Sequence, residues 1–425
     1  MRSLPRPIII ALLTCIVTVI LVNFSSVTYG RELLYLKINI VSVSLILLTI
    51  FLTVIIIQAQ FFVNYRISLQ KMFILLLFRL IFTFSTSSLI IFYFYFEWSL
   101  IPIFLIVIGW GYQPERLLAR MALFFYTIFA SLPLLVIILN RYIEINRFEF
   151  TISSIVDPNV FSTWSTFMYI FFTGAFLVKF PMFMVHMWLP KAHVEAPVSG
   201  SIILAGVLLK LGGYGLRRVS IFLDKPWIQI VLFSLILLGG GLLGVLCLAQ
   251  SDIKVVIAYS SVVHISLVII GFLSLLPIGG EGGIMIMIAH GFCSSAIFAG
   301  ANIMYERSHS RRYLINTGFL MYYPFFRILW FILIVANFGG PFTYNLLGEI
   351  LLILNIRYIN LSLMVCICLL SLFSAGYSLI LYRRTQQGQA GNICNLFSSF
   401  TAREYVLLVM HIWVLVILPL NSIIT

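Results

Sequence analysis

Residues Ile40–Ile57 read IVSVSLILLTIFLTVIII, a run that is apolar on every face. At about 1.5 Å per residue, such a run can cross most of the roughly 30 Å hydrocarbon core of a bilayer. A strand of a membrane β-barrel would instead alternate apolar and polar residues over about ten positions. The run therefore predicts a transmembrane α-helix, which satisfies its own backbone hydrogen bonds in lipid.

The whole chain of 425 residues is similarly rich in apolar residues. Hydrophobic residues make up 62% and charged residues 9%, with a mean hydropathy of +1.12. A soluble domain is about a quarter charged, so a water-soluble enzyme and a disordered chain are both excluded. The net charge is +13, but no run of five or more basic residues occurs. We therefore expect membrane lipid as the surroundings and no nucleic-acid partner.

Thirteen segments have the length and apolar character of membrane helices, so the chain is predicted to be an all-α, polytopic membrane protein. The expected spans cover about 8–24, 39–61, 72–88, 89–110, 117–139, 164–189, 199–216, 227–249, 253–273, 282–304, 324–354, 361–382 and 404–420. The connections between them are too short for a further domain, so residues 1–425 are expected to form a single transmembrane domain.

The middle of the chain divides into two blocks of five spans, 72–216 and 227–382, with flanking helices in 1–71 and 383–425. Because five is an odd number, the second block would be inverted relative to the first, as in many transporters. The fourth span of each block is long and contains helix-breaking residues. They are Pro181 and Pro190 around the first break, and Gly339, Gly340 and Pro341 around the second. Paired interruptions of this kind indicate an ion path.

Ionisable residues lie within several of the expected spans. A charged side chain at a helix centre costs at least about 2.5–3.5 kcal/mol, so it persists only with a partner, water or a function. Burial and a nearby opposite charge shift the pKa of an amine in opposite directions, so a buried lysine can release its proton when its acid partner moves away. Histidines titrate near neutrality and can bridge such sites. We expect a proton relay formed by Glu97, Lys179, Lys210 and Glu349, with His186, His193, His264 and His290 as secondary members.

A purely structural role is the alternative for each of these residues. Glu97 and Lys179 could form a static ion pair, and the histidines could be hydrogen-bonded interhelical residues or caps of the broken helix. A static pair explains one acid and one base, but it explains poorly two lysines, two histidines and two glutamates in separate spans. Arg79 is expected to snorkel to a membrane surface, and Lys254 with Asp252 is expected at the mouth of a span.

The stretch Leu177–Arg217, LVKFPMFMVHMWLPKAHVEAPVSGSIILAGVLLKLGGYGLR, closely resembles the subunit 4 family of the mitochondrial NADH–ubiquinone oxidoreductase, respiratory complex I. Further matches occur in order and at compatible spacing: FEWSLIPIFLIVIGWGYQPER (Phe96–Arg116), SDIKVVIAYSSVVHIS (Ser251–Ser266), IAHGFCSSAIFAGANIMYER (Ile288–Arg307) and NLLGE (Asn345–Glu349). The resemblance covers about 90–400 and fades before about residue 70.

The resemblance implies an antiporter-like, proton-translocating subunit in the membrane arm of that enzyme, in the mitochondrial inner membrane. The four ionisable residues of the family's proton path correspond to Glu97, Lys179, Lys210 and Glu349. It also implies that the chain binds no cofactor itself, whereas the complex uses NADH, FMN, iron–sulfur clusters and ubiquinone. The expected partners are other membrane-arm subunits, including neighbouring antiporter-like ones. The family usually has fourteen transmembrane spans, and the additional span would lie at the N-terminus.

The resulting hypothesis is a subunit of an H⁺-translocating NADH:ubiquinone reductase, with electron transfer in other subunits driving the proton through this one. The cysteines lack iron–sulfur spacing, and no glycine-rich dinucleotide motif follows a strand. Two alternatives are a subunit of a sodium/proton antiporter with the same fold and a structural membrane scaffold.

Overall fold

The computed structural model describes residues 31–33, 36–60, 66–111, 113–145, 166–220, 226–318, 323–388 and 400–424. Within these ranges the chain is almost entirely helical, with a short antiparallel pair of strands before the first described helix. The elements are β1 (Arg31–Leu33), β2 (Leu36–Ile38), α2 (Ile40–Ala59), α3 (Arg66–Ser85), α4 (Leu89–Trp98), α5 (Leu100–Trp110), α6 (Arg116–Ile145), α8 (Thr166–Lys179), α9 (Trp188–Glu195), α10 (Val198–Ile203), η2 (Leu204–Leu208), α11 (Leu209–Ser220), α12 (Pro226–Ala249), α13 (Ile253–Leu273), α14 (Pro277–Ser308), α16 (Pro324–Asn337), α17 (Tyr344–Ile359), α18 (Leu363–Gln386) and α19 (Ala402–Ile424).

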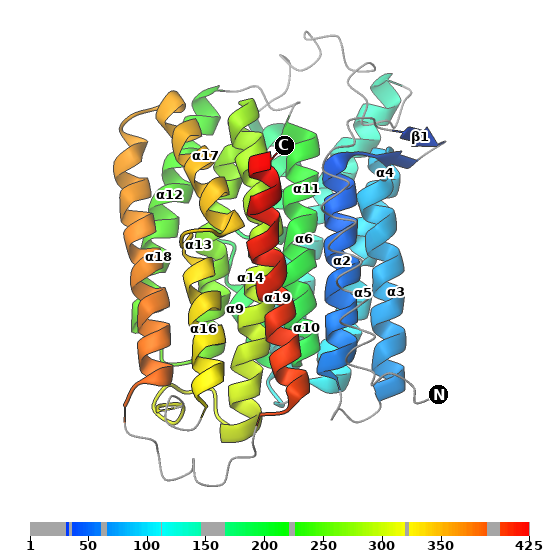
Figure 1. The fold of residues 1–425 in the computed structure, drawn as a ribbon. Helices are drawn as coiled ribbons and strands as arrows, with labels where there is room; N and C mark the ends of the chain where they lie inside the picture. The colour runs from blue at the N-terminus through cyan, green and yellow to red at the C-terminus, as the bar shows by residue number, and fades with distance from the viewer. Residues whose placement is uncertain are drawn as a thin grey trace.

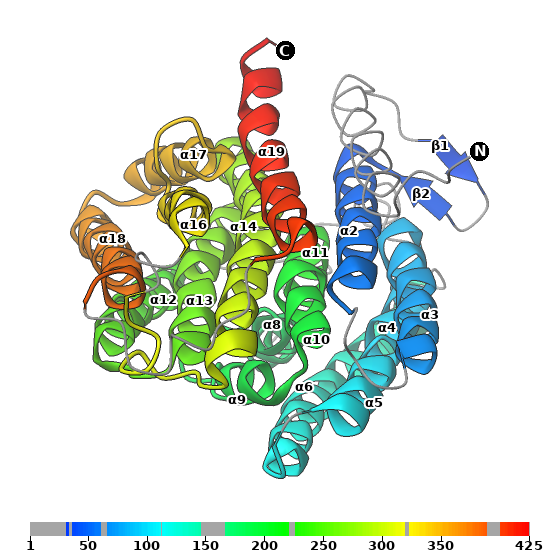
Figure 2. The same cartoon turned by 60° about the horizontal axis from the view of Figure 1, so that its bottom comes forward.

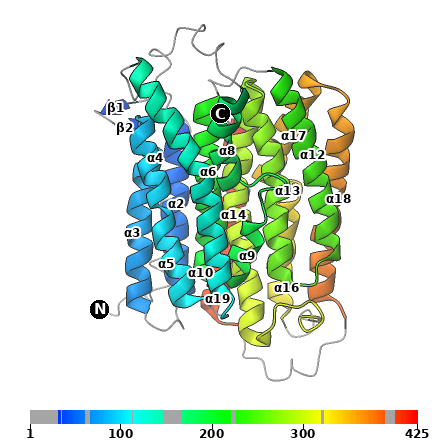
Figure 3. The ribbon, with the colours of Figure 1, turned by 180° about the vertical axis from the view of Figure 1, so that it is seen from behind.

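The long helices stand side by side as a bundle (Figures 1 and 3). Among the described residues, ten helices are long and apolar enough to cross a membrane, and two shorter apolar helices, α8 and α16, belong to interrupted elements. These elements coincide with the expected spans from residue 39 onward, while the span expected at 8–24 lies outside the described residues. The prediction of an all-α polytopic membrane protein is confirmed.

The centre of the bundle is formed by α13, α14 and the segment α10–η2–α11, which Figure 2 shows between α12 and α18 on one side and α2–α6 on the other. Nearly all residues of these central helices are buried, whereas α3, α6 and α18 expose apolar side chains such as Phe78, Phe129 and Leu372. An apolar outer surface suits hydrocarbon or a neighbouring membrane subunit. Lys210, His264 and His290 therefore lie on helices that other helices of the bundle cover.

The first interrupted element breaks between α8 and α9 because of Pro181. This residue has no N–H to donate to the Leu177 carbonyl, and the amide of Met182 donates to it instead, at 3.1 Å. The Val178 carbonyl thereby loses its helical donor, and the indole N–H of the buried Trp188 donates to it at 3.0 Å. Both of these carbonyls therefore have a hydrogen-bond donor, although the helix does not continue.

Pro190, which was also expected to break the helix, lies inside α9 near its start. The first amides of a helix have no intrahelical acceptor, so a proline is tolerated there. The expectation for Pro190 is therefore wrong, and the non-helical segment covers 180–187. This segment leaves Lys179 as the last residue of α8.

The second interrupted element breaks between α16 and α17, as the sequence predicted. Gly339 takes a φ of 74°, in the left-handed region that favours glycine, and Pro341 follows two residues later. The side-chain amide of Asn345, in the first turn of α17, donates to the carbonyls of Ala336 and Asn337 at 3.1 Å each. The last turn of α16 is thus capped from across the break.

A local irregularity also occurs between α10 and α11. The five residues of η2 form a turn of π-helix, in which the amide of Leu209 bonds the carbonyl of Leu204. Such turns insert one extra residue and are frequent at functional sites. Lys210 follows two residues after this turn, and its side chain points back onto it, where Nζ donates to the Ala205 carbonyl.

Arg79 does not snorkel to a membrane surface, so that expectation is wrong. The side chain lies in α3 with 8% of its surface exposed, and its Nη1 donates to the Trp98 carbonyl at 2.8 Å. Its guanidinium carbon lies 4.2 Å from the centroid of the Trp98 ring. Arg79 is therefore a buried residue that joins α3 to the junction of α4 and α5.

Candidate functional site

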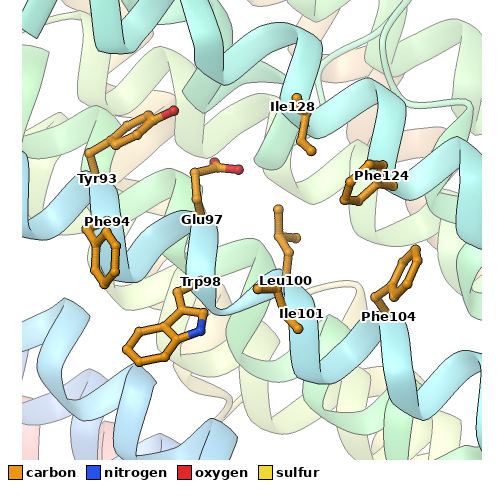
Figure 4. A pocket seen from close by; sticks show the side chains of 9 residues that line it. All are labelled: Tyr93, Phe94, Glu97, Trp98, Leu100, Ile101, Phe104, Phe124 and Ile128. Atoms are coloured by element: carbon orange, nitrogen blue, oxygen red, sulfur yellow. The ribbon is translucent and has the colours of Figure 1, made fainter.

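Glu97 occupies the last turn of α4 and reaches into a cleft of about 510 Å³ between α4, α5 and α6. Figure 4 shows its carboxylate extending among Tyr93, Phe124 and Ile128, with Trp98 on the same helix turning away. The other residues lining the cleft are mostly apolar. Glu97 keeps 20% of its side-chain surface exposed and Glu349 keeps 16%, so the two acids are the accessible members of the site.

Lys179 faces Glu97 from the broken end of α8. Its Nζ lies 3.9 Å from Glu97 Oε1, 3.2 Å from the centroid of the Phe96 ring, and donates to the Phe96 carbonyl. The lysine is almost completely buried, with 3% of its surface exposed. The predicted partnership of Glu97 and Lys179 is thus present as an ion pair with a loose separation, in contact with an aromatic face.

Lys210 lies at the centre of the bundle, with 1% of its surface exposed. Its Nζ donates to the Ala205 carbonyl of the π-helical turn at 2.5 Å and lies 3.1 Å from Nδ1 of His290 on α14. A charged amine has three protons and no lone pair, so His290 Nδ1 must be the acceptor of that contact when Lys210 is protonated. Lys210 and His290 are therefore placed to exchange a proton directly.

His264 and Glu349 continue the row from His290. The rings of His290 and His264 are 5.7 Å apart, and His264 Nδ1 lies 3.6 Å from Glu349 Oε1. The hydroxyl of Tyr377, on α18, lies 3.5 Å from His264 Nε2. Four residues predicted from separate spans, Lys210, His290, His264 and Glu349, thus lie in one row, although among the described residues no hydrogen bond joins the two histidines or joins His264 Nδ1 to Glu349. Tyr377 gave no signal in the sequence, because a tyrosine in an apolar run resembles a packing residue.

The two remaining histidines are not joined to this line by side-chain hydrogen bonds in the described part of the chain. His186, in the break, packs between the rings of Phe183 and Tyr259, with centroid distances of 5.8 Å to each. His193, on α9, stacks on Phe298 at 4.5 Å, and neither of its ring nitrogens has a hydrogen-bond partner. The structure places both near the relay candidates without a direct contact to them.

The site consists of two groups, the Glu97–Lys179 pair and the line from Lys210 to Glu349. No hydrogen bond or ion pair between described residues connects Lys179 to Lys210. Their helices nevertheless touch, because a Cβ placed on Gly212 of α11 would lie 2.7 Å from the backbone nitrogen of Phe180, directly after Lys179. Close approach of the α8 end to α11 therefore depends on this glycine.

A further cluster of charges lies beyond α9. Glu195 is buried and its Oε1 lies 3.8 Å from Nη1 of Arg311, while Lys254 is buried at the start of α13, with its Nζ 3.5 Å from the Ala196 carbonyl. The sequence indicated Lys254 as a residue at the mouth of its span but did not single out Glu195. Within the described residues, no group of three or more histidine, cysteine or acidic residues could hold a metal ion.

The arrangement consists of groups that can bind and release protons. The line contains an amine, two imidazoles and a carboxylate in that order, and each of these groups can take up and release a proton. The separation of 3.9 Å between Glu97 and Lys179 is longer than a hydrogen bond, so a small displacement of either helix alters their attraction.

Comparisons with known proteins agree with this geometry. The family described as NADH:quinone oxidoreductase/Mrp antiporter, transmembrane region, matches residues 86–374. The NADH-ubiquinone oxidoreductase chain 4 of Ceratitis capitata is 43% identical over 409 residues, covering 95% of this chain and 91% of that protein.

Two solved structures share the fold at low sequence identity. A chain of respiratory complex I from Thermus thermophilus, with bound NADH, superposes with a TM-score of 0.81 at 22% identity, over 98% of this chain and 91% of that one. A chain of the Mrp complex from Dietzia superposes with a TM-score of 0.77 at 16% identity, over 90% and 75%. Together with the family match and the curated relative, these findings show that the chain belongs to the NADH-ubiquinone oxidoreductase chain 4 family of antiporter-like membrane subunits.

Proposed function

We propose that this chain translocates protons across the mitochondrial inner membrane as a membrane-arm subunit of NADH:ubiquinone oxidoreductase. The observation that carries the proposal is the line Lys210–His290–His264–Glu349, whose members lie on four helices, α11, α14, α13 and α17. The separations are 3.1 Å from the lysine Nζ to His290 Nδ1, 5.7 Å between the two imidazole centroids, and 3.6 Å from His264 Nδ1 to the Glu349 carboxylate. Buried ionisable groups are expensive in a membrane protein, and a line of them is typical of proton relays. Family membership supports the same assignment.

The proposed path begins at Glu97, one of the two partly exposed acids, and passes to Lys179. When Glu97 lies close, its charge favours the protonated lysine, and when the pair separates, the desolvated lysine favours release of its proton. Electron transfer in other subunits would supply the energy for that separation. The released proton would pass to Lys210 and then along the histidines to Glu349.

Water is the proposed link between the two groups, since the described side chains leave the step from Lys179 to Lys210 unbridged. The break at 180–187 contains backbone groups that no longer pair within a helix, and such groups favour ordered water. His186 and His193, with unpartnered ring nitrogens, are proposed as secondary members that hold this water. They would support the transfer without carrying the proton directly.

We further propose that 72–216 and 227–382 form two inverted five-helix blocks. The proposal is supported by the interruption of one element in each block, α8–α9 and α16–α17, with an ionisable residue beside each break. Lys179 ends α8, and Glu349 lies in α17 against Gly339. In this view the two breaks play equivalent parts at the two ends of the path.

A sodium/proton antiporter subunit is the second candidate, favoured by the likeness of the fold to the Mrp complex. The test compares proton translocation by membrane vesicles containing the assembled complex in the presence and absence of Na⁺. We expect translocation to follow NADH oxidation and to be unchanged in Na⁺-free medium. Proton movement that is driven by a Na⁺ gradient without NADH would replace the proposed function with the antiporter.

A prediction concerns the second break. Gly339 has a φ of 74°, which costs an alanine about 1–2 kcal/mol, and a Cβ there would lie 2.5 Å from Glu349 Oε2. We expect Gly339→Ala to displace the Glu349 carboxylate and to lower proton translocation per NADH oxidised by about tenfold, in line with the effect of small misplacements at reacting groups. The matched control is Gly241→Ala, where a Cβ meets nothing within 4 Å. Equal translocation by both variants would contradict the role given to Glu349.

A further inference from the structure

The junction between α4 and α5 contains a backbone carbonyl that its own helix cannot satisfy. The carbonyl of Trp98 would normally accept a hydrogen bond from the amide four residues later, but that residue is Pro102, which has no N–H. Ser99 keeps right-handed helical angles, φ −64° and ψ −22°, so the chain direction continues through the junction. What is missing at this point is a donor for Trp98.

Arg79 supplies that donor from a different helix. Its Nη1 donates to the Trp98 carbonyl at 2.8 Å, and its guanidinium lies against the Trp98 ring, 4.2 Å from the centroid. The Trp98 ring is itself stacked on Tyr95, with centroids 6.1 Å apart, and covers the charge from the outer surface of the bundle. A charge in a membrane span needs compensating partners, and here they are a backbone carbonyl and an aromatic face.

The residue between the two bonded carbonyls is Glu97. On one side, Lys179 donates to the carbonyl of Phe96, and on the other side Arg79 donates to the carbonyl of Trp98. The backbone that carries the Glu97 side chain is thus held from α8 and from α3 at the carbonyls of the residues before and after it. The carboxylate reaches into the cleft from this doubly held turn, as Figure 4 shows for Glu97 and Trp98.

We infer that Arg79 is a positioning residue, which replaces the hydrogen bond that Pro102 removes and so fixes the turn that presents Glu97 to Lys179. The inference rests on the proposed role of Glu97 in proton transfer. Arginine suits the task because it stays charged and combines a directed donor with a planar face for Trp98. Pro102 leaves the Trp98 carbonyl without its helical donor, and the hydrogen bond from Arg79 fixes the orientation of this turn.

The test uses a pair of substitutions that exchange one donor for another, made in the assembled complex. Arg79→Met removes the side-chain donor, and we expect it to lower proton translocation per NADH oxidised by about tenfold, since a displacement of about 1 Å at a positioned group can cost up to about a hundredfold. Pro102→Ala supplies a backbone N–H four residues after Trp98. Proton translocation by the double variant, Arg79→Met with Pro102→Ala, is therefore expected to lie within about twofold of that of Pro102→Ala alone. The reason is that the backbone N–H of the alanine can replace the donor lost with the arginine.

The controls separate this inference from the proposed function and from simple packing. Arg120→Met removes a second arginine that lies over an aromatic ring, 4.5 Å from the Phe104 centroid, and is expected to leave translocation unchanged. If Arg79→Met translocates normally, or if the double variant is as defective as Arg79→Met, the inference is overturned. If Arg79→Met does not assemble, assembly and translocation by the double variant support the inference, and failure of the double variant overturns it. Normal translocation by Glu97→Gln would instead reject the role proposed for Glu97, on which the inference rests.

Discussion

Replacing Lys179 with methionine is expected to abolish proton translocation by a complex that still assembles. Methionine keeps the length and the apolar stem of the lysine, so packing against the Phe96 ring is retained while the amine 3.9 Å from Glu97 is removed. Loss of a positioned acid–base group typically lowers a rate by about 10²–10⁴-fold, and a relay has no substitute for a missing member. The measurement is proton uptake by vesicles per NADH oxidised, with the amount of assembled complex determined in parallel.

The chain contains a matched control for this substitution. Lys191 lies in α9, a few residues beyond the break, but its side chain is exposed. Lys191→Met removes the same charge from the same segment and is expected to leave translocation unchanged. Wild-type translocation by an assembled Lys179→Met complex would exclude Lys179 from the path. Parallel loss of assembly and translocation on neutralising Glu97 would favour the scaffold alternative.

The positions of the broken helices could be predicted because their causes are local. Pro181 removes a hydrogen bond within its own turn, and Gly339 allows a backbone angle that other residues avoid. The same reasoning was wrong for Pro190, since its effect depends on whether it falls in the interior of a helix or in its first turn. The position of Pro190 is known from the sequence, but the residue at which α9 begins could not be predicted from it.

The contacts within the site could be predicted only in part. The cost of burying charge identified Lys210, His264 and Glu349 as members of one site, but their order depends on how α11, α13 and α17 are rotated against one another. Arg79 was wrongly expected at a surface, because its position in the span indicates its depth but not its hydrogen-bond acceptor. Its acceptor arises on another helix, through the missing amide of Pro102, and becomes visible only when α3 is packed against the junction.

The central lysine offers the sharpest distinction between a relay and a static charge. Lys210 is buried, with its Nζ bonded to the Ala205 carbonyl and 3.1 Å from His290. Arginine at this position would keep the positive charge and several donors, but it does not release its proton in proteins. A scaffold needs the charge alone, whereas a relay needs a group that alternates between protonated and neutral forms.

We therefore expect Lys210→Arg and Lys210→Met both to lose proton translocation, by about 10²-fold or more, as for the removal of other acid–base groups. Assembly of each variant is measured by the yield of intact complex, because arginine is bulkier and methionine removes a buried charge. An assembled Lys210→Arg complex that translocates normally would show that the charge is sufficient and would remove Lys210 from the relay. An arginine variant that assembles but does not translocate would support the relay. It would indicate that position 210 must release a proton to His290, and that a positive charge at this position is not sufficient.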